Sequence, residues 1–562
     1  MEPTIEQLHE LFVPAGEVSE DDFEKARIAK EASEIGVVNV LISRGLLKDS
    51  TMGKRMGEFY HVPFVSLKDT HVSSEVAQLL PEAFARRHLL LPIKAEDHSY
   101  VIATSTPDDL LERSLLEKYL RHPIEFVYAT PLDLKTHMYL FAKDPTKGLE
   151  VILQKRSTDP NAPDTTTIEL VDAVIDYAYQ GGASDIHIEP EESYTKVRFR
   201  QDGLLHDIFT LPSSLHDNVM TRLKVLAKLA TDERRTSQDG KIRHKTKWGE
   251  KVEVRLSLIP TTHGEKSVMR LLADRSGTYN LSTLGFAEED YRKVSDVIHR
   301  PWGMILVTGP TGSGKSTSLY SILTVLNKRE VNITTIEDPV EFDIEGVTQI
   351  QVNEKTGLTF AKGLRSIVRQ DPDIVMVGEI RDSETANIAV NAAMTGHLVL
   401  STLHTNDSAT AFPRLQDMGV EDFLIASTVN IVIAQRLVRK ICSNCIEEID
   451  SDAIHEKILQ QNPHIKQFLQ DLTQKKVLKS LKTFRGKGCS VCHKSGYHGR
   501  VGVFEVLTVD ETIREAIMAH KNADEIRTLA LQEGMTTMVY DGLRKMLSGQ
   551  TTLEEILRVT KE

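Results

Sequence analysis

Short, continuously apolar segments alternate with helical patterns in a long central part of the chain. Such a segment is typical of a strand buried on both faces of a parallel sheet. The candidate strands are Met304–Thr308, Asn332–Ile336, Ile374–Val377 and Leu398–Thr402. After the first of them, Leu319, Ile322, Leu323 and Leu326 recur at the spacing of a helix with one buried face. The pattern predicts an α/β core whose ligand site lies beyond the carboxyl ends of the strands.

The segment before this core shows a different order of elements. Apolar positions over Ile168–Ile175 follow a helical period, whereas Lys196–Arg200 and Lys251–Leu256 alternate between apolar and polar residues. Alternation of this kind is typical of strands with one buried face. A helix followed by such strands predicts an α+β domain.

The first part of the chain mixes helical patterns with one candidate strand, Tyr100–Ala103. The stretch from Phe141 to Thr166 is rich in turn-forming and charged residues. It predicts a linker, with a short helix near Leu149–Gln154.

A chain of 562 residues is too long for one hydrophobic core. We therefore expect several domains. They are a mostly helical N-terminal domain (1–145), a linker (146–165), the α+β domain (166–275), the α/β core (276–440), an insertion with all the cysteines (441–505) and a helical C-terminal region (506–562).

Composition narrows the class of protein. No apolar run approaches the roughly 20 residues of a membrane helix, and the acidic start Met1–Glu6 does not resemble a signal peptide. These features predict a cytoplasmic protein. A net charge of −13 argues against nucleic acid as a partner, and the basic stretch Lys475–Lys487 is local. A nucleic-acid translocase is therefore the less favoured alternative.

The segment Gly309–Thr317 fits the phosphate-binding pattern G-x-x-x-x-G-K-[ST] and follows the first candidate strand. Glycines let backbone N–H groups surround phosphate oxygens, while the lysine neutralises charge and the following hydroxyl can bind Mg²⁺. The sequence therefore predicts that a nucleoside triphosphate and Mg²⁺ bind here. The expected contacts come from Gly309, Thr311, Gly312, Ser313, Gly314, Lys315, Ser316 and Thr317.

Three polar groups follow the other candidate strands. The acidic segment Glu337–Glu341 comes after the second strand, and a carboxylate there can orient the attacking water. A solvated acidic loop is the alternative. Glu379 follows the third strand and is the candidate Mg²⁺-side acid, and His404 follows the fourth and is positioned to sense the terminal phosphate.

All four cysteines fall in two C-x-x-C pairs, Cys442 with Cys445 and Cys489 with Cys492. Four thiolates at this spacing predict a closed, structural Zn²⁺ site. Redox-active thiols are the alternative.

The order of these motifs resembles the secretion ATPase superfamily, and within it the type IV pilus assembly and type II secretion ATPases. The resemblance covers roughly residues 163–562. Beside the phosphate loop it rests on Glu337–Glu341, Gly378–Asp382, Gly396–Asp407 and Gly182–Pro190. It implies a RecA-like ATPase core, a preceding α+β (PAS-like) domain and a zinc-binding insertion.

The resemblance also implies roles and partners. Glu337 is the expected water-activating carboxylate, Glu379 the Walker B acid and His404 the histidine-box residue, while Arg255 and Arg270 of the preceding domain approach the nucleotide phosphates. The implied assembly is a homo-hexamer with ATP between the two domains. It acts at the inner face of the cytoplasmic membrane on an inner-membrane platform protein and a cytoplasmic docking protein. Pilus extension is the leading function, and type II secretion shares all these motifs.

The N-terminal segment Val40–Leu47 resembles a motif that binds cyclic di-GMP in some members of the family. Gly36, Val37 and Val38 stand where that pattern has arginine, leucine and glycine, and Phe59 replaces a glutamine. These departures predict that the domain docks to a membrane partner rather than sensing a nucleotide.

Overall fold

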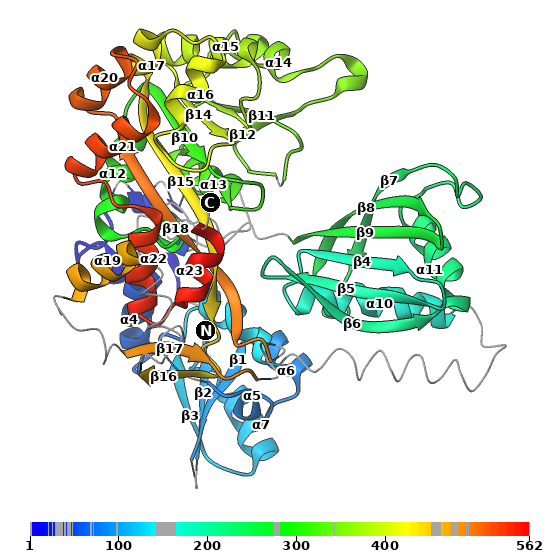
Figure 1. Ribbon diagram of the computed structural model, residues 1–562. Coiled ribbons are helices and arrows are strands. Elements are labelled where there is room, and N and C mark those ends of the chain that lie inside the picture. The colour runs from blue at the N-terminus through cyan, green and yellow to red at the C-terminus, as the bar shows by residue number, and fades with distance from the viewer. Residues whose placement is uncertain are drawn as a thin grey trace. The chain divides into compact units, whose positions relative to one another are not determined.

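The computed structural model describes residues 3–20, 22–24, 26–27, 37–38, 41, 47, 49–67, 70, 72–96, 99–141, 165–273, 281–341, 343–450, 462–473, 482–489, 492 and 494–560. The chain forms two compact units (Figure 1). The first comprises Met1–Pro14, Asp49–Arg275 and Gly488–Ser495, and the second comprises Ala15–Lys48, Ser276–Lys487 and Gly496–Glu562. The predicted helix at Leu149–Gln154 and most of Val40–Leu47 lie outside the described residues.

The N-terminal part of the first unit contains a small sheet of order β1-β2-β3, from Leu90–Ala95, Tyr100–Thr104 and Ile124–Tyr128. The strand expected from the sequence is β2, and the structure adds its antiparallel neighbour β1 and its parallel neighbour β3. Short helices accompany the sheet. They are α1 (Ile5–Phe12), α4 (Asp49–Phe59), α5 (Ser74–Ala77), α6 (Glu82–His88), α7 (Leu110–Leu120), α8 (Pro131–His137) and the 3₁₀ turn η1 (Met138–Phe141).

The second half of the first unit is an α+β domain with an antiparallel sheet of order β6-β5-β4-β9-β8-β7. Alternate residues of its strands are buried, as in β8, because helices cover only one face. These are α10 (Thr165–Gln180) and α11 (Ser213–Leu226) (Figure 1). The strands are β4 (Asp185–Pro190), β5 (Tyr194–Gln201), β6 (Leu204–Pro212), β7 (Gln238–Lys245), β8 (Lys251–Thr261) and β9 (Gly264–Ala273).

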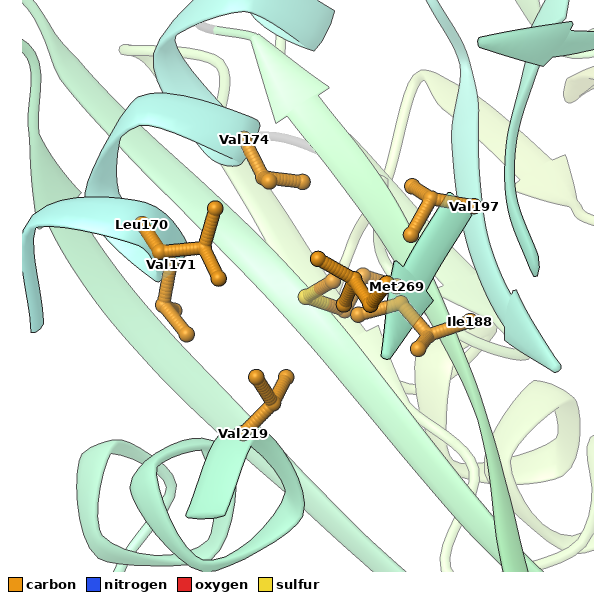
Figure 2. A pocket seen from close by; sticks show the side chains of 8 residues that line it. Leu170, Val171, Val174, Ile188, Val197, Val219 and Met269 are labelled. Carbon is orange, nitrogen blue, oxygen red and sulfur yellow. The ribbon is translucent and has the colours of Figure 1, made fainter. Parts of the chain in front are cut away.

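A small cavity lies between these two helices and the sheet (Figure 2). Its lining consists of aliphatic side chains and one methionine, so it offers no polar group to orient a ligand. We interpret it as a packing gap of the domain core. The lining residues are Leu170, Val171, Val174, Ile188, Val197, Leu211, Val219 and Met269.

The second unit is built on a seven-stranded sheet of order β12-β11-β13-β14-β10-β15-β18. All neighbouring strands are parallel except β15 and β18. The predicted strands are confirmed as β10 (Gly303–Thr308), β11 (Ile333–Glu337), β13 (Ile374–Val377) and β14 (Leu398–Leu403). The sheet also contains β12 (Val347–Gln351), β15 (Val429–Ile441) and β18 (Tyr497–Thr508).

Helices cover both faces of this sheet, which explains why its strands are apolar throughout. One face packs against α12 (Glu288–Ile298) and α13 (Lys315–Leu326), the helix expected after the phosphate loop. The other packs against α14 (Phe360–Ile367), α15 (Ser383–Met394), α16 (Ala411–Asp417), α17 (Asp422–Thr428), α20 (Glu511–Met518) and α21 (Ala523–Gln532). The 3₁₀ turns η2 (Leu281–Thr283) and η3 (Glu354–Thr356) complete this region.

The cysteine-bearing insertion begins and ends inside the core sheet. It leaves at the end of β15 and returns at the start of β18, where Ile441 pairs with Tyr497. Between them lie β16 (Ile446–Asp450), α19 (Pro463–Thr473) and β17 (Lys482–Gly486), and α22 (Met538–Leu547) and α23 (Leu553–Thr560) end the chain. None of the helices in the described ranges is long and apolar enough to cross a membrane.

Candidate nucleotide-binding site

The phosphate loop connects β10 to α13, and its conformation requires glycine. Gly309, Gly312 and Gly314 all have positive φ angles, of 144°, 79° and 91°. A Cβ on Gly309 would lie 2.6 Å from the carbonyl oxygen of Gln435, and one on Gly314 would lie 3.0 Å from its Nε2. Larger residues would therefore push the loop off β15.

Lys315 begins α13, and its ammonium group lies against the loop. Its Nζ donates hydrogen bonds to the carbonyl oxygens of Gly309 at 2.8 Å and Pro310 at 3.1 Å. Burial lowers the pKa of Lys315, the nearby Arg436 lowers it further, and the carboxylate of Glu379 raises it. The lysine therefore lies within the electrostatic field of both groups. Ser316 on the same turn is exposed, so its hydroxyl is accessible to a ligand.

The remaining residues of the phosphate loop differ in their exposure to solvent. Thr311 and Thr317 are exposed, whereas Ser313 is buried. The Ser313 Oγ has no hydrogen-bond partner among the described residues. The outward-facing members are those that can contact a bound phosphate chain.

Gln435 on β15 holds the loop in place, and this role was not predicted from the sequence. Its Nε2 donates to the carbonyl oxygen of Ser313 at 2.7 Å, and its Oε1 accepts from the Ser318 hydroxyl at 2.7 Å. The side chain is 2% exposed. The sequence did contain a signal, because Gln435 and Arg436 are the only polar residues between Ile431 and Val438 of this strand.

Glu337 is the last residue of β11, whereas the sequence pattern placed it just after the strand. It is 4% exposed, and both carboxylate oxygens accept hydrogen bonds. Oε1 accepts from Thr335 Oγ1 at 2.5 Å and Gln349 Nε2 at 3.0 Å, and Oε2 accepts from the hydroxyl of Tyr320. Burial, together with the Glu337 charge, raises the pKa of Tyr320, so this phenol stays a donor. The contacts hold the carboxylate in one orientation.

Glu379 and His404 meet, as their places after neighbouring parallel strands predict. Glu379 Oε2 lies 3.0 Å from Nε2 of His404 and 2.7 Å from Nε of Arg381. The Glu379 side chain is 13% exposed and that of His404 is 42% exposed, so the histidine forms the outer part of the cluster. His397, at the opposite end of β14, contacts the carbonyl oxygen of Ala392 instead.

The two arginines expected from the preceding domain lie side by side in the first unit. Arg255 on β8 and Arg270 on β9 are directly opposite each other in the strand register, so they share a face of the sheet. Arg270 Nε donates to Asp185 Oδ1 at 3.0 Å, and the arginine side chain remains 63% exposed. On β7 the register continues with Lys241 opposite Arg255. The structure therefore groups the predicted pair on a positively charged part of this sheet.

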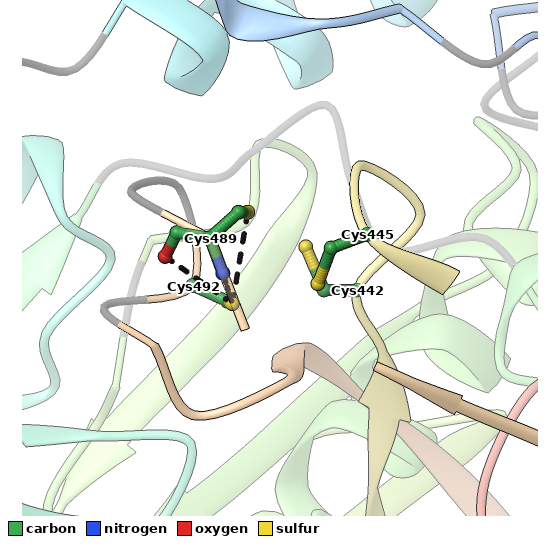
Figure 3. Close-up of side chains that lie close together, drawn as sticks. All are labelled: Cys442, Cys445, Cys489 and Cys492. Carbon is green, nitrogen blue, oxygen red and sulfur yellow. Dashed lines mark hydrogen bonds between the residues drawn. The ribbon is translucent and has the colours of Figure 1, made fainter. Parts of the chain in front are cut away.

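The two C-x-x-C pairs come together (Figure 3). Their four Sγ atoms lie within 4.8 Å of one another, and Cys489 Sγ is 3.7 Å from Cys492 Sγ. None of the four forms a disulfide. Tetrahedral Zn²⁺ with bonds of about 2.3 Å sets its sulfur atoms about 3.8 Å apart, so the donor set fits zinc in type and spacing.

Comparisons with known proteins show the family and the fold. Residues 161–558 match the model of the family described as type II/IV secretion system protein, and residues 60–140 match the MshEN domain. The chain is 36% identical to the type IV pilus assembly ATPase PilB of Myxococcus xanthus, over 98% of both chains. It is 38% identical to the type II secretion system protein E of Xanthomonas campestris, also over 98% of both. The fold resembles that of the ATPase DotB of Yersinia pseudotuberculosis, with a TM-score of 0.52 and 21% identity over 70% of this chain and 93% of that one.

Proposed function

The chain belongs to the type II/IV secretion system protein family and is an ATPase, and we propose that it powers the assembly of type IV pili. In this role it extracts pilin subunits from the inner membrane and adds them to the pilus base. The supporting observation is the match to the pilus assembly ATPase of Myxococcus xanthus, which covers 98% of both chains. The likeness therefore includes the N-terminal part as well as the ATPase core.

ATP binding is assigned to the phosphate loop. In this proposal the backbone N–H groups of Gly312 and Gly314 and the ammonium group of Lys315 bind the phosphates, and the accessible Ser316 hydroxyl binds Mg²⁺. Glu379 completes the metal side, directly or through water. Bound Mg²⁺ would neutralise charge that develops on the phosphate oxygens. His404, in contact with Glu379, transmits the state of this cluster to the loop after β14.

Glu337 is proposed to orient the attacking water. Its three hydrogen bonds fix the carboxylate at the carboxyl end of β11, and Tyr320 ties it to α13, the helix that carries Lys315. A carboxylate locked in this way needs no reorganisation before the reaction. Water would reach it from the side of the exposed Asp338.

The site is proposed to be completed by a second domain. Arg255 and Arg270 are on a different unit from the phosphate loop and share one sheet face. We propose that they approach the phosphates when the two domains close around ATP, and that a homo-hexamer arranges the chains for this contact. The ring would work at the inner face of the cytoplasmic membrane with a platform protein and a docking protein, without nucleic acid.

Type II secretion is the second candidate, because the Xanthomonas campestris secretion protein also matches over 98% of both chains. Deleting the gene and scoring surface pili against secreted protein separates the two. Loss of pili with normal secretion supports pilus assembly. Loss of secreted protein with normal piliation would assign the chain to secretion instead.

A further inference from the structure

Arg436, next to Gln435 on β15, reaches the loop that follows β14. Its Nη2 lies 3.2 Å from Oδ1 and 3.4 Å from the backbone oxygen of Asn406. Asn406 is two residues beyond His404. Successive residues of a strand point to opposite sides. Gln435 therefore hydrogen-bonds to the phosphate loop, while Arg436 hydrogen-bonds to the loop that follows β14. Strand β15 therefore holds both loops of the site.

The charge of Arg436 is poorly compensated. Its Nη1 is buried and has no hydrogen-bond partner among the described residues. Burial lowers the pKa of Arg436, and the carboxylate of Asp407 offsets part of that effect. Asp407 forms its hydrogen bonds with another residue. Its Oδ1 accepts from the Thr410 N–H at 2.8 Å and from the Thr410 hydroxyl at 2.7 Å. A buried guanidinium donor without a partner is costly unless a ligand satisfies it.

The place of Arg436 on β15 points to an anionic ligand. Gln435, the preceding residue, donates a hydrogen bond to the carbonyl oxygen of Ser313, so Arg436 follows directly the residue that holds the loop carrying Lys315. Two cations kept together in a half-buried site repel each other, and an anion between them reverses the sign of the interaction. Arg436 also contacts Asn406, two residues beyond His404, and the His404 ring contacts Glu379. Arg436 therefore reaches the loop on which the histidine and the Mg²⁺-side carboxylate meet.

We propose that Arg436 binds the terminal phosphate of ATP, as a cation supplied by the same domain as the phosphate loop. A guanidinium group suits this role because its planar fork can donate to Asn406 with one nitrogen and to a phosphate oxygen with the other. Through Asn406, the contact links the terminal phosphate to the segment that carries His404. The proposal depends on the ATPase activity and not on the pilus role.

Nucleotide affinities test this contact without relying on turnover. With Mg²⁺ present, Arg436→Gln is expected to weaken binding of the non-hydrolysable analogue AMP-PNP about ten- to a hundredfold, the loss expected for a hydrogen bond to a charged group. ADP binding should change by less than about threefold, because ADP lacks that phosphate. Arg436→Lys keeps the charge but loses the forked guanidinium group. Its affinity for AMP-PNP should therefore lie between those of the wild type and Arg436→Gln.

Arg414→Gln is the matched control, since Arg414 is an exposed arginine on α16. Its affinities for both nucleotides should equal those of the wild type. Equal losses for ADP and AMP-PNP in Arg436→Gln would show that Arg436 only supports the loop, and unchanged affinities would exclude the contact. If Arg436→Gln does not fold, as judged by circular dichroism, the ADP to AMP-PNP ratio of Arg436→Lys decides: an unchanged ratio rejects the proposal.

Discussion

The ATPase core and the six-stranded sheet hold their predicted cations in different ways. In the core, Lys315 is half-buried, bonded to its own loop and in the field of Glu379. On the sheet, Arg270 is 63% exposed and bonded to one carboxylate, Asp185. The core site is organised by its own domain before a ligand arrives, whereas Arg270 of the sheet remains largely exposed. We therefore expect the core cation, Lys315, to control nucleotide binding and the sheet cation, Arg270, to affect turnover more than binding.

The largest effect is expected from Lys315→Ala. This change removes the ammonium group that neutralises the phosphates, so turnover should fall about a thousandfold and nucleotide binding should weaken with it. Steady-state phosphate release and titration with a fluorescent nucleotide measure the two quantities. Lys328→Ala, on an exposed lysine just after the same helix, is the control. Retention of full nucleotide affinity by Lys315→Ala would contradict the role of the core in nucleotide binding.

Glu337→Gln should separate binding from chemistry within the core. The amide cannot act as a base, so turnover should fall at least about a hundredfold while nucleotide affinity stays within about threefold of the wild type. Glu341→Gln, in the same acidic segment, is the control and should keep most of the activity. Equal turnover in Glu337→Gln and the wild type would refute the assignment of Glu337.

Arg270→Ala tests the other side of the comparison. Loss of this exposed cation should leave nucleotide affinity of the isolated chain nearly unchanged and reduce turnover about ten- to a hundredfold. Lys241 lies in the same register of the sheet and pairs with Glu253, so Lys241→Ala controls for general loss of positive charge.

In the wild type, activity per chain should rise with protein concentration if the site is completed by assembly. A fully active monomer, or an unchanged rate in Arg270→Ala, would remove the sheet from the site.

The parallel strands of the ATPase core were more predictable from the sequence than the elements that pack around them. Strands such as β13 were found because burial on both faces makes them continuously apolar, and the motifs after β13 and β14 met because parallel strands end at one edge. By contrast, β18 joins the sheet only after the cysteine insertion, through long-range pairing with β15. A local pattern cannot reveal such pairing. For the same reason Glu505 on β18, buried and bonded to Ser408, looked like an ordinary glutamate.

In the first unit, prediction failed where strands were short. Strand β1 contains Pro92 and Lys94 and is buried only in its first half, so its pattern is weak. Strand β3 does alternate, but five residues give little periodic signal. The choice of Arg255 and Arg270 followed from the family resemblance and not from any property of their local sequence, because many arginines of this domain have similar neighbours.

Binding of Zn²⁺ by the four cysteines is expected to stabilise the core through β15 and β18, because Cys442 follows the end of β15 and Cys492 precedes the start of β18. Cys442→Ser is expected to lower the thermal unfolding midpoint by about 5 °C and the zinc content to near zero, because a structural zinc site contributes folding energy. Turnover should fall less than in the preceding variants. Ser443→Ala, within the same C-x-x-C pair, should match the wild type. Less than half an equivalent of zinc per purified wild-type chain would reject the site.

The smallest effect is expected near the C-terminal end of β15, where Arg439 and Arg558 both bind Glu555 of α23. Burial alone would raise the pKa of Glu555, but the hydrogen bonds from Arg558 and Arg439 lower it from 4.5 to about 2. The ionised carboxylate therefore stabilises the fold above pH 4.5, and this contribution is lost as the pH falls toward 2. Glu555→Gln should lower the unfolding midpoint by about 3 °C at neutral pH, and the difference from the wild type should shrink toward pH 3.

Glu554→Gln, on the exposed side of the same helix, should show no such pH dependence. Because the Glu555 cluster lies beyond Gln435 and Arg436 on the strand, nucleotide affinity should not change in Glu555→Gln. A parallel loss of affinity would mean that the core site depends on the C-terminal helix as well as on its own loops.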